Sequence, residues 1–232
     1  MRLMQKITAY FSRTELILWG CSVALIVPAF YLFDGENPLT LLASLIGVTS
    51  LIFNAKGNPF GQFLMVIFSL LYGYISFTFS YYGEMITYLG MTLPMALFAL
   101  ISWLRNPYQG KRAEVAVNTI SKREAGAMWV LTAAVTVLFY FILAFFHTAN
   151  LIPSTLSVST SFLAAYLTFR RSPCFALAYA ANDVSLIVLW VLASFCDVRY
   201  FSVVVCFAAF LAHDIYGYIS WQRMKLRQSQ GL

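Results

Sequence analysis

Eight long runs of apolar residues dominate this chain of 232 residues. Most runs are about 20 residues long, which is enough for a helix to cross a hydrocarbon core of roughly 30 Å. The runs lie at Leu16–Phe33, Leu39–Phe53, Phe60–Phe79, Met85–Leu104, Ala125–Phe146, Ile152–Phe169, Phe175–Phe195 and Phe201–Trp221. Few residues remain outside them, so we predict an all-α membrane protein with eight transmembrane helices in a single transmembrane domain, residues 1–232.

The low content of charged residues excludes an ordinary soluble domain. Charged residues make up 10% of the chain and apolar residues 61%, whereas a soluble domain carries roughly 25% charged residues. The net charge of +6 does not indicate nucleic-acid binding, because the basic residues are dispersed at the ends of the apolar runs and form no basic helix. We expect them to set the orientation of the chain in the membrane.

Lysine and arginine are divided unequally between the two sides that eight spans define. Fourteen of the 15 lie on one side, and Arg199 alone lies on the other. That opposite side carries the acidic residues Asp34, Glu36, Glu84 and Asp197. The positive-inside rule then predicts that both termini are cytoplasmic.

Two parts of the chain repeat each other. Lys56-Gly-Asn-Pro59 matches Arg170-Arg-Ser-Pro173 at an offset of 114 residues, and Ile101-Ser-Trp-Leu-Arg105 matches Ile219-Ser-Trp-Gln-Arg223 at an offset of 118. One span between two triplets gives both copies the same orientation. Such parallel repeats are typical of transporters whose substrate lies between the copies. The alternative is a coincidental match between apolar segments.

This parsing predicts two parallel three-helix repeats joined by a linker helix, plus one extra N-terminal helix. Residues 1–37 form the extra span, 38–105 the first repeat, 106–150 the linker span, 151–223 the second repeat and 224–232 a basic cytoplasmic tail. Trp103 and Trp221 end the two repeats, and we expect both at the cytoplasmic boundary of the membrane as interfacial aromatics. The second and sixth spans are short, and matching short spans point to a binding region.

Polar residues interrupt the seventh span near the middle of the bilayer. An ionisable group at that depth is costly unless it faces the bundle interior or water, and Asp183 follows Asn182 there. Helical spacing places Tyr179 and Trp190 on the same stripe. We interpret the stripe as substrate-binding, with an interhelical structural pair as the alternative for the two polar residues.

The repeat offset maps this stripe onto the third span. Asn182 corresponds to Phe68, Asp183 to Ser69, and the next turn to Tyr72. Tyr88 lies on a comparable stripe of the fourth span. Together these residues suit a small polar ring compound with hydroxyl groups, including a cationic one, because aromatic faces attract cations by roughly 0.5–2 kcal/mol.

Three further residues are candidates for a gate or a structural role. Asp214 lies one helical turn from Tyr218, and a gate, a structural hydrogen bond and a substrate contact all remain open for it. Pro94 is a candidate hinge of the fourth span. The hydroxyl groups of the sixth span favour helix packing over pore lining, and His213 is interpreted as a packing residue.

The motifs of enzymes and metal sites are missing from the sequence. It contains no Walker-type loop, zinc-binding helix motif or nucleophile elbow, so we predict no enzyme activity and no cofactor. His147 and His213 have no partners at useful spacing, so we expect no metal site. Asp183 and Asp214 are too few to argue for a proton or sodium relay, which favours facilitated diffusion.

Several segments together resemble the PnuC family of bacterial vitamin transporters. They are Lys56-Gly-Asn-Pro-Phe-Gly61, Tyr72-Gly-Tyr74, Tyr81-Tyr-Gly-Glu84, Ile101-Ser-Trp103, Asn182-Asp183 and Asp214-Ile-Tyr-Gly-Tyr218. The resemblance covers roughly Pro38 to Arg223. It implies a SWEET-like arrangement in the bacterial inner membrane, surrounded by lipid, and it permits a homotrimer.

The resemblance also implies a substrate class. Well-known members move nicotinamide riboside, a form of vitamin B3, by facilitated diffusion, and a cytosolic kinase traps it for NAD synthesis. Many of these carriers have a Trp-x-x-Trp pattern before the intramembrane aspartate, where this chain has Cys174 and Leu177. We therefore expect a nicotinamide riboside uniporter, with a deoxynucleoside or thiamine carrier and a non-transporting membrane scaffold or sensor as alternatives.

Overall fold

Eight helices of membrane-spanning length form the described part of the chain. The computed structural model describes residues 10–78, 82–148 and 150–231. Eight segments there are long and apolar enough to cross a bilayer, which confirms the predicted all-α architecture. In chain order the elements are α2 (Arg13–Ala29), η1 (Phe30–Asp34), α3 (Pro38–Ala55), α4 (Pro59–Thr78), α5 (Tyr82–Ile86), η2 (Thr87–Thr92), α6 (Leu93–Arg105), β1 (Pro107–Tyr108), β2 (Lys111–Val115), α7 (Lys122–Phe145), α8 (Leu151–Phe169), α9 (Phe175–Ser194), η3 (Val198–Tyr200) and α10 (Phe201–Ser229).

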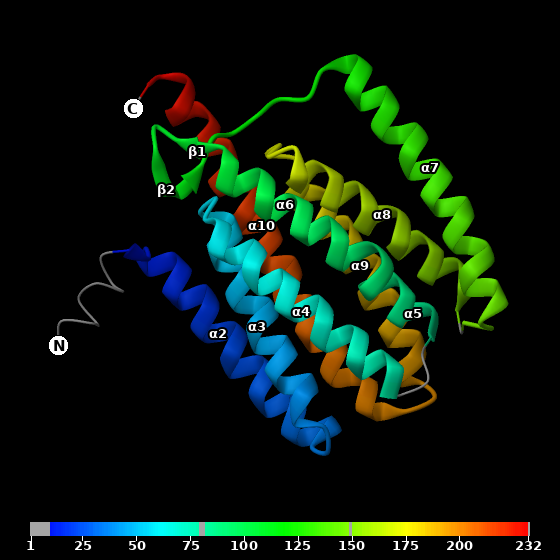
Figure 1. Ribbon diagram of the computed structural model, residues 1–232. Helices are drawn as coiled ribbons and strands as arrows, with labels where there is room; N and C mark the ends of the chain where they lie inside the picture. Colours follow the sequence, from blue (N-terminus) through cyan, green and yellow to red (C-terminus); the bar gives the residue numbers. More distant parts are fainter. Residues whose placement is uncertain (1–9, 79–81, 149, 232) are drawn as a thin grey trace.

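The two copies form one bundle in which each copy packs against the other. The first copy consists of α3, α4 and α5–η2–α6, and the second consists of α8, α9 and α10. Figure 1 shows their helices side by side, with α10 of the second copy behind α3 and α4 of the first. A buried apolar core with residues from α3, α4, α9 and α10 joins the copies.

Two tryptophans bridge the copies by equivalent hydrogen bonds. Trp103 on α6 donates to the carbonyl of Thr168 on α8 at 2.8 Å, and Trp221 on α10 donates to the carbonyl of Asn54 on α3 at 2.7 Å. Both acceptors lie in the last turn of a helix, where carbonyls lack a helical partner. Both indoles are 0% exposed, and their ring centroids are 5.4 Å apart. The prediction that they are interfacial aromatics is therefore wrong.

The corners after α3 and α8 have the same backbone conformation. Gly57 has φ of 66° and Arg171 has φ of 57°, both in the left-handed region. Each donates its backbone N–H at 2.9 Å to the residue three positions earlier, Asn54 or Thr168. A left-handed residue after a helix satisfies the last carbonyls and allows the chain to turn. The repeat seen in the sequence is thus repeated in backbone geometry.

The equivalence extends to the helix that precedes each copy. Glu15 in the first turn of α2 forms an ion pair with Lys56 at 3.2 Å, and Glu124 in the first turn of α7 forms one with Arg170. Lys56 and Arg170 occupy matching positions in the two corners. Serine caps both helices, since the hydroxyl of Ser12 or Ser121 accepts the backbone N–H of the glutamate.

The extra helix α2 contacts both copies. Besides its bond to Lys56, Glu15 accepts a hydrogen bond from the Tyr216 hydroxyl of α10 at 3.2 Å. Two turns further along α2, Ser22 is hydrogen bonded to buried His213 at 2.9 Å. His213 therefore packs between helices, as the sequence indicates. In contrast, α7 lies at the outer edge of the bundle, beside α8 (Figure 1).

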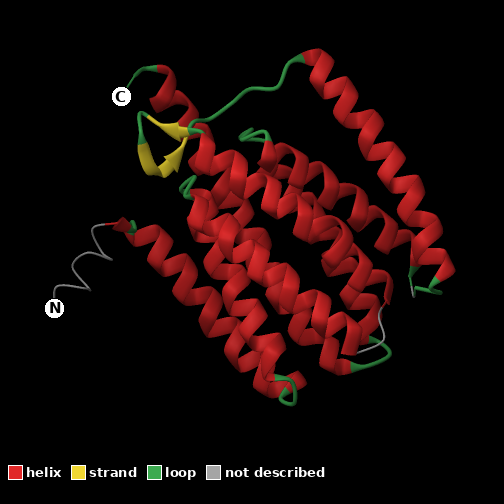
Figure 2. Ribbon diagram, viewed as in Figure 1, coloured by secondary structure: helices red, strands yellow, loops and turns green. Residues whose placement is uncertain are grey.

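A small hairpin that the sequence did not predict lies at one end of the bundle. Figure 2 shows its two strands, β1 and β2, beside the end of α10. The backbone N–H of Val115 donates to the carbonyl of Gly57 at 2.9 Å, and Gln228 accepts from the backbone N–H of Val117 at 2.8 Å. Residues 224–229 continue α10, and Gln228 among them holds the hairpin.

The fourth span is irregular near its middle. It changes from α5 to the π-helix η2 and then to α6. Pro94, in the first turn of α6, has no N–H and its ring would clash with the carbonyl of Gly90 in a regular helix. The π turn accommodates the proline, and it carries Thr87, Tyr88 and Thr92. Such turns often occur at functional sites.

Candidate functional site

A cavity lies between the two copies. It encloses about 80 Å³, and we call it the central cavity. Its walls come from α3, α4, α5, η2, α7, α8, α9 and α10. Among the residues that the structure describes, the polar and aromatic ones lining it are Phe68, Glu84, Thr87, Tyr88, Thr92, Ser154, Ser157, Ser161, Tyr179, Asn182, Asp183, Trp190, Phe207, Phe210 and Asp214.

Asn182 is held by hydroxyl groups of α8. Its Oδ1 lies 3.2 Å from the Ser157 hydroxyl, 3.0 Å from Thr160 and 3.0 Å from Ser161. Thr160 also lies within reach of backbone carbonyls of its own helix, and its single proton serves one acceptor at a time. Ser157 and Ser161 donate to the amide oxygen. This arrangement fixes the side chain, and none of the hydrogen bonds to Asn182 within the described part of the chain uses its two N–H groups.

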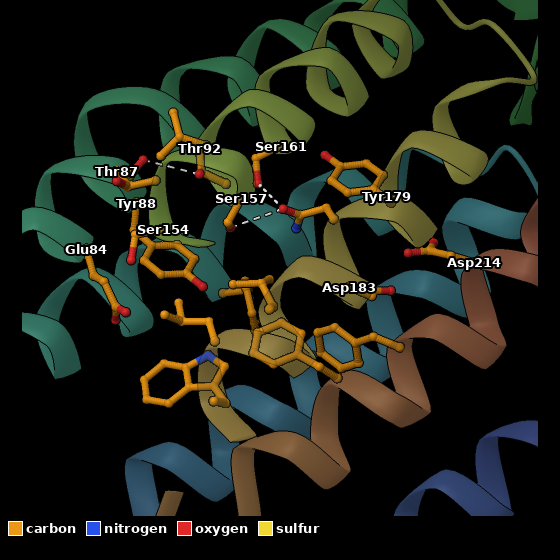
Figure 3. Close-up of a pocket in the computed structure, with 18 of the residues that line it drawn as sticks. Glu84, Thr87, Tyr88, Thr92, Ser154, Ser157, Ser161, Tyr179, Asp183 and Asp214 are labelled. Carbon is orange, nitrogen blue, oxygen red and sulfur yellow. Dashed lines mark hydrogen bonds between the residues drawn. The ribbon is translucent and has the colours of Figure 1, made fainter. Parts of the chain in front are cut away.

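Two carboxyl groups face each other in the central cavity. Asp183 on α9 and Asp214 on α10 are 3% and 4% exposed, and Figure 3 shows their carboxyl groups pointing toward one another. Among the described residues, Asp183 Oδ2 has no hydrogen-bond partner. An unpaired buried carboxylate oxygen is costly, so this atom is a natural acceptor for a donor on a ligand.

Aromatic rings from both copies surround the carboxyl groups. The Phe68 ring centroid is 6.2 Å from that of Tyr88 and 6.0 Å from that of Phe210. Tyr179 lines the same cavity, and Figure 3 shows its ring between Ser161 and Asp214. The Trp190 indole is 5.4 Å from the Tyr200 ring, centroid to centroid. These rings provide faces for stacking on a flat, positively charged group.

The structure brings most of the predicted site residues together. Those that line the central cavity are Asn182, Asp183, Tyr179, Trp190, Phe68, Tyr88 and Asp214. Tyr72 lines a neighbouring cavity and stacks near Phe68, with centroids 4.7 Å apart. Asp214, for which the sequence left three roles open, lies beside Asp183 in the cavity wall.

Three further predicted residues line neither the central cavity nor the neighbouring one. The hydroxyl of Ser69 donates to the carbonyl of Met65 at 2.8 Å and is fully buried. Tyr218 packs against the cluster that contains Trp103 and Trp221. Pro94 acts through the shape of the fourth span, as described above. None of the three lines the wall that a ligand would contact.

Several lining residues were not predicted from the sequence. Glu84 was expected on the acidic side, just before the fourth apolar run, and Thr87 was not a candidate, although both line the cavity. Helix packing was the favoured role for the hydroxyl groups of α8, whereas Ser154, Ser157 and Ser161 line the cavity. A useful signal was available for the serines, because Ser154, Ser157 and Ser161 recur at helical spacing on one face.

Comparisons with known proteins agree with this architecture. A family profile described as "Nicotinamide mononucleotide transporter" matches residues 37–223. A curated protein named nicotinamide riboside transporter PnuC, from Neisseria mucosa, is 25% identical over 207 residues, which cover 86% of this chain and 77% of that protein. The PnuC of Haemophilus influenzae is 22% identical over 197 residues, or 85% of this chain and 84% of that protein.

The fold is also similar to a solved structure. A crystal structure described as that of the vitamin B3 transporter PnuC matches with a TM-score of 0.76 and 22% sequence identity, over 94% of each chain. That likeness shows that the two folds correspond. The profile match covers both copies and the linker helix between them. The chain therefore belongs to the nicotinamide mononucleotide transporter family and is a multi-pass membrane transporter, not an enzyme.

Proposed function

We propose that this protein is a uniporter for nicotinamide riboside. The observation that carries the proposal is the composition of the central cavity. Three carboxyl groups, from Glu84, Asp183 and Asp214, line it together with aromatic rings and hydroxyl groups. Nicotinamide riboside combines a flat cationic ring with a ribose rich in hydroxyl groups, and this lining complements both parts.

The charge of the cavity favours the riboside over the mononucleotide. A phosphate group is bound in proteins by arginine, lysine or a helix N-terminus. None of the described residues lining the central cavity is a lysine or an arginine. The curated relatives carry the riboside in their names, in agreement with this chemistry. We therefore place the riboside ahead of its phosphorylated form as the substrate.

Each part of the substrate has an appropriate partner in the proposed site. Asn182 and Asp183 bind the ribose hydroxyls or the carboxamide, since Asn182 has N–H groups to donate and Asp183 Oδ2 has no hydrogen-bond partner among the described residues. Phe68, Tyr88 and Tyr179 frame the ring, with Trp190 at one edge. Asp214 places another carboxyl group on the side opposite Glu84, as Figure 3 shows.

Transport requires the central cavity to widen. Its 80 Å³ is small beside the roughly 300–1,000 Å³ of pockets that hold small molecules. Rocking of one copy against the other would open it, as in other transporters built from repeats. The π turn η2 before Pro94 is the proposed hinge, because a π turn already departs from regular helical bonding.

The direction of net flux follows from chemistry outside this chain. Passive transport leads to accumulation only if the cell consumes the substrate, and phosphorylation by a cytosolic kinase gives an anion that cannot return through an acidic cavity. The product then enters NAD synthesis. Basic residues flank one end of the helices, with Lys56, Arg170 and Arg223 among them, and we propose that this end is cytoplasmic in the bacterial inner membrane.

Two other substrates retain a specific rationale. Thiamine carries a cationic ring and suits the same carboxyl groups, and a deoxynucleoside suits the aromatic and amide groups. Cys174 and Leu177 stand where many riboside carriers have tryptophans. This difference is the reason for testing thiamine and a deoxynucleoside as alternative substrates. Competition by thiamine or a deoxynucleoside against labelled riboside discriminates among them.

Calorimetry on purified protein tests the proposal. We expect nicotinamide riboside to bind with a Kd in the micromolar range, and Asn182→Ala to weaken binding by about tenfold or more, because a lost buried hydrogen bond network is worth at least about 1.4 kcal/mol. Asn118→Ala is the matched control, since its amide bonds to the Arg170 carbonyl at the end of the bundle. No riboside flux in proteoliposomes with folded protein would contradict the proposal and favour a non-transporting scaffold.

A further inference from the structure

Glu84 and Trp190 lie where three cavities meet. Both line the central cavity. Both also line a second cavity, the outer cavity, whose wall includes Asp34, Asp197 and Arg199 at the end of the bundle opposite the basic corners. Both line a third cavity between α5, α9 and the segment after α7. Glu84 and Trp190 are the two lining residues that the outer cavity shares with the central cavity, so a direct path between the two cavities runs beside them.

The carboxyl group of Glu84 has no counter-ion in the part of the chain that the structure describes. Among residues 10–78, 82–148 and 150–231, no side chain forms an ion pair or hydrogen bond with it. Arg199, which lines the outer cavity, is already bonded to Asp197 at 2.8 Å and to Glu36 at 3.5 Å. A carboxyl group in a half-buried, aromatic surrounding is costly without a partner. A cationic ligand would offset that cost.

Trp190 supplies a second unused group at the same place. The side chain is 9% exposed, and its Nε1 has no hydrogen-bond partner among the described residues. A buried indole N–H normally finds an acceptor, as Trp103 and Trp221 do in this protein. Its ring lies near that of Tyr200, which also lines the outer cavity. The place where the three cavities meet, which we call the junction, therefore offers one carboxyl group, aromatic faces and an indole N–H without a partner among the described residues.

We infer that Glu84 and Trp190 form an outer subsite that binds the cationic aromatic ring of the substrate before it reaches Asn182 and Asp183. The inference rests on the proposed function and deepens it, because it assigns the selection of positively charged substrates to Glu84 and Trp190. Glu84 attracts the ring charge, Trp190 stacks on the ring, and its N–H donates to a carboxamide oxygen. Tyr88, one turn along from Glu84, lines the continuation into the central cavity.

Uptake by proteoliposomes tests the subsite with two probes that differ in charge. The probes are nicotinamide riboside and its uncharged dihydro form, which has the same ribose and carboxamide. In Glu84→Gln we expect the KM for the cation to rise about tenfold, the scale of one lost charge pair in a partly buried site. The KM for the neutral probe is expected to stay within about twofold.

A matched control and a second measurement make the result decisive. Glu36→Gln removes a carboxyl group at the same end whose side chain is 80% exposed, and it should leave both KM values unchanged. An unchanged cation KM in Glu84→Gln, or an equal rise for both probes, would overturn the inference. If that variant does not fold, the wild-type protein decides, since equal KM values for the two probes would also overturn it.

The outcomes separate this inference from the proposed function. Absence of riboside flux in the wild-type protein would contradict the proposed function itself. Wild-type flux together with a charge-independent effect of Glu84→Gln would remove only the outer subsite.

Discussion

The two copies share a scaffold but differ in the residues they present to the cavity. Both have a left-handed corner, a buried tryptophan bonded to the other copy, and an ion pair to the preceding helix. The second copy supplies Asn182, Asp183 and Asp214, whereas the matching first-copy residues Phe68 and Ser69 are an aromatic ring and a serine bonded to its own helix. The features that the copies share thus maintain the helix arrangement, and the residues in which they differ determine the polar groups that line the cavity.

The largest effect is expected where the copies are alike. Trp103→Ala and Trp221→Ala should each lower the free energy of unfolding by roughly 3–5 kcal/mol, because each removes a fully buried indole. Phenylalanine at either position should cost only about 1 kcal/mol, for the hydrogen bond alone. Thermal unfolding in detergent measures both. A marked difference between the two positions would break the structural equivalence of the copies.

The next effect is expected where the copies differ. Asp183→Asn should weaken riboside binding by about tenfold to a hundredfold, the range for a hydrogen bond to a charged group. Ser69→Ala, at the matching position, should leave the Kd within about twofold, because its hydroxyl bonds to Met65 and does not line the cavity. Calorimetry of the pair checks this. Equal losses would mean that both copies recognise the substrate alike.

The ion pairs to the preceding helices should differ in strength. Glu15 is 3% exposed and bonds to both Lys56 and Tyr216, so Glu15→Gln should lower stability by about 2 kcal/mol. Glu124 and Arg170 are more exposed, with side chains 21% and 35% exposed. Glu124→Gln should therefore cost less than about 1 kcal/mol. Chemical denaturation of each variant measures the difference, and a larger loss for Glu124→Gln would contradict it.

The smallest effects concern the corners. Gly57→Ala should destabilise by about 1–2 kcal/mol because a side chain at φ of 66° is strained. Its Cβ would also approach the Met224 side chain at 3.1 Å. Arg171→Gly should change stability by less than about 1 kcal/mol, since relief of strain is offset by the greater freedom of the unfolded chain. A stabilising Gly57→Ala would show that the corners are not equivalent.

The fold was largely predictable because the bilayer imposes a simple rule on helix length. Apolar runs and matching corner motifs gave the eight helices and the two copies. A second rule, which treats a tryptophan beside basic residues at the end of a span as interfacial, gave the wrong surroundings for Trp103 and Trp221. Nothing in the sequence showed that backbone carbonyls at the ends of α3 and α8 would accept the indole N–H groups of these tryptophans.

The site was predictable only in part. Periodicity and the repeat offset correctly placed Asn182, Asp183 and Phe68 on one cavity. They also predicted Ser69 as a site residue. The repeat offset shows which residues correspond, but it does not show which partner each side chain bonds to. Glu84 was missed because it lies near the end of a span, where a charged residue is usually assigned to the adjoining loop. Its role depends on Trp190, which is 106 positions away in the chain.

The central claim is that an acidic, aromatic cavity between two unequal copies binds a cationic riboside. Side-by-side calorimetry of nicotinamide riboside and nicotinamide mononucleotide on the wild-type protein tests it most directly, because the two differ by one phosphate group. The account predicts a binding heat for the riboside and at least about a hundredfold weaker binding of the mononucleotide, since buried carboxyl groups repel phosphate. Equal or tighter binding of the mononucleotide would contradict it.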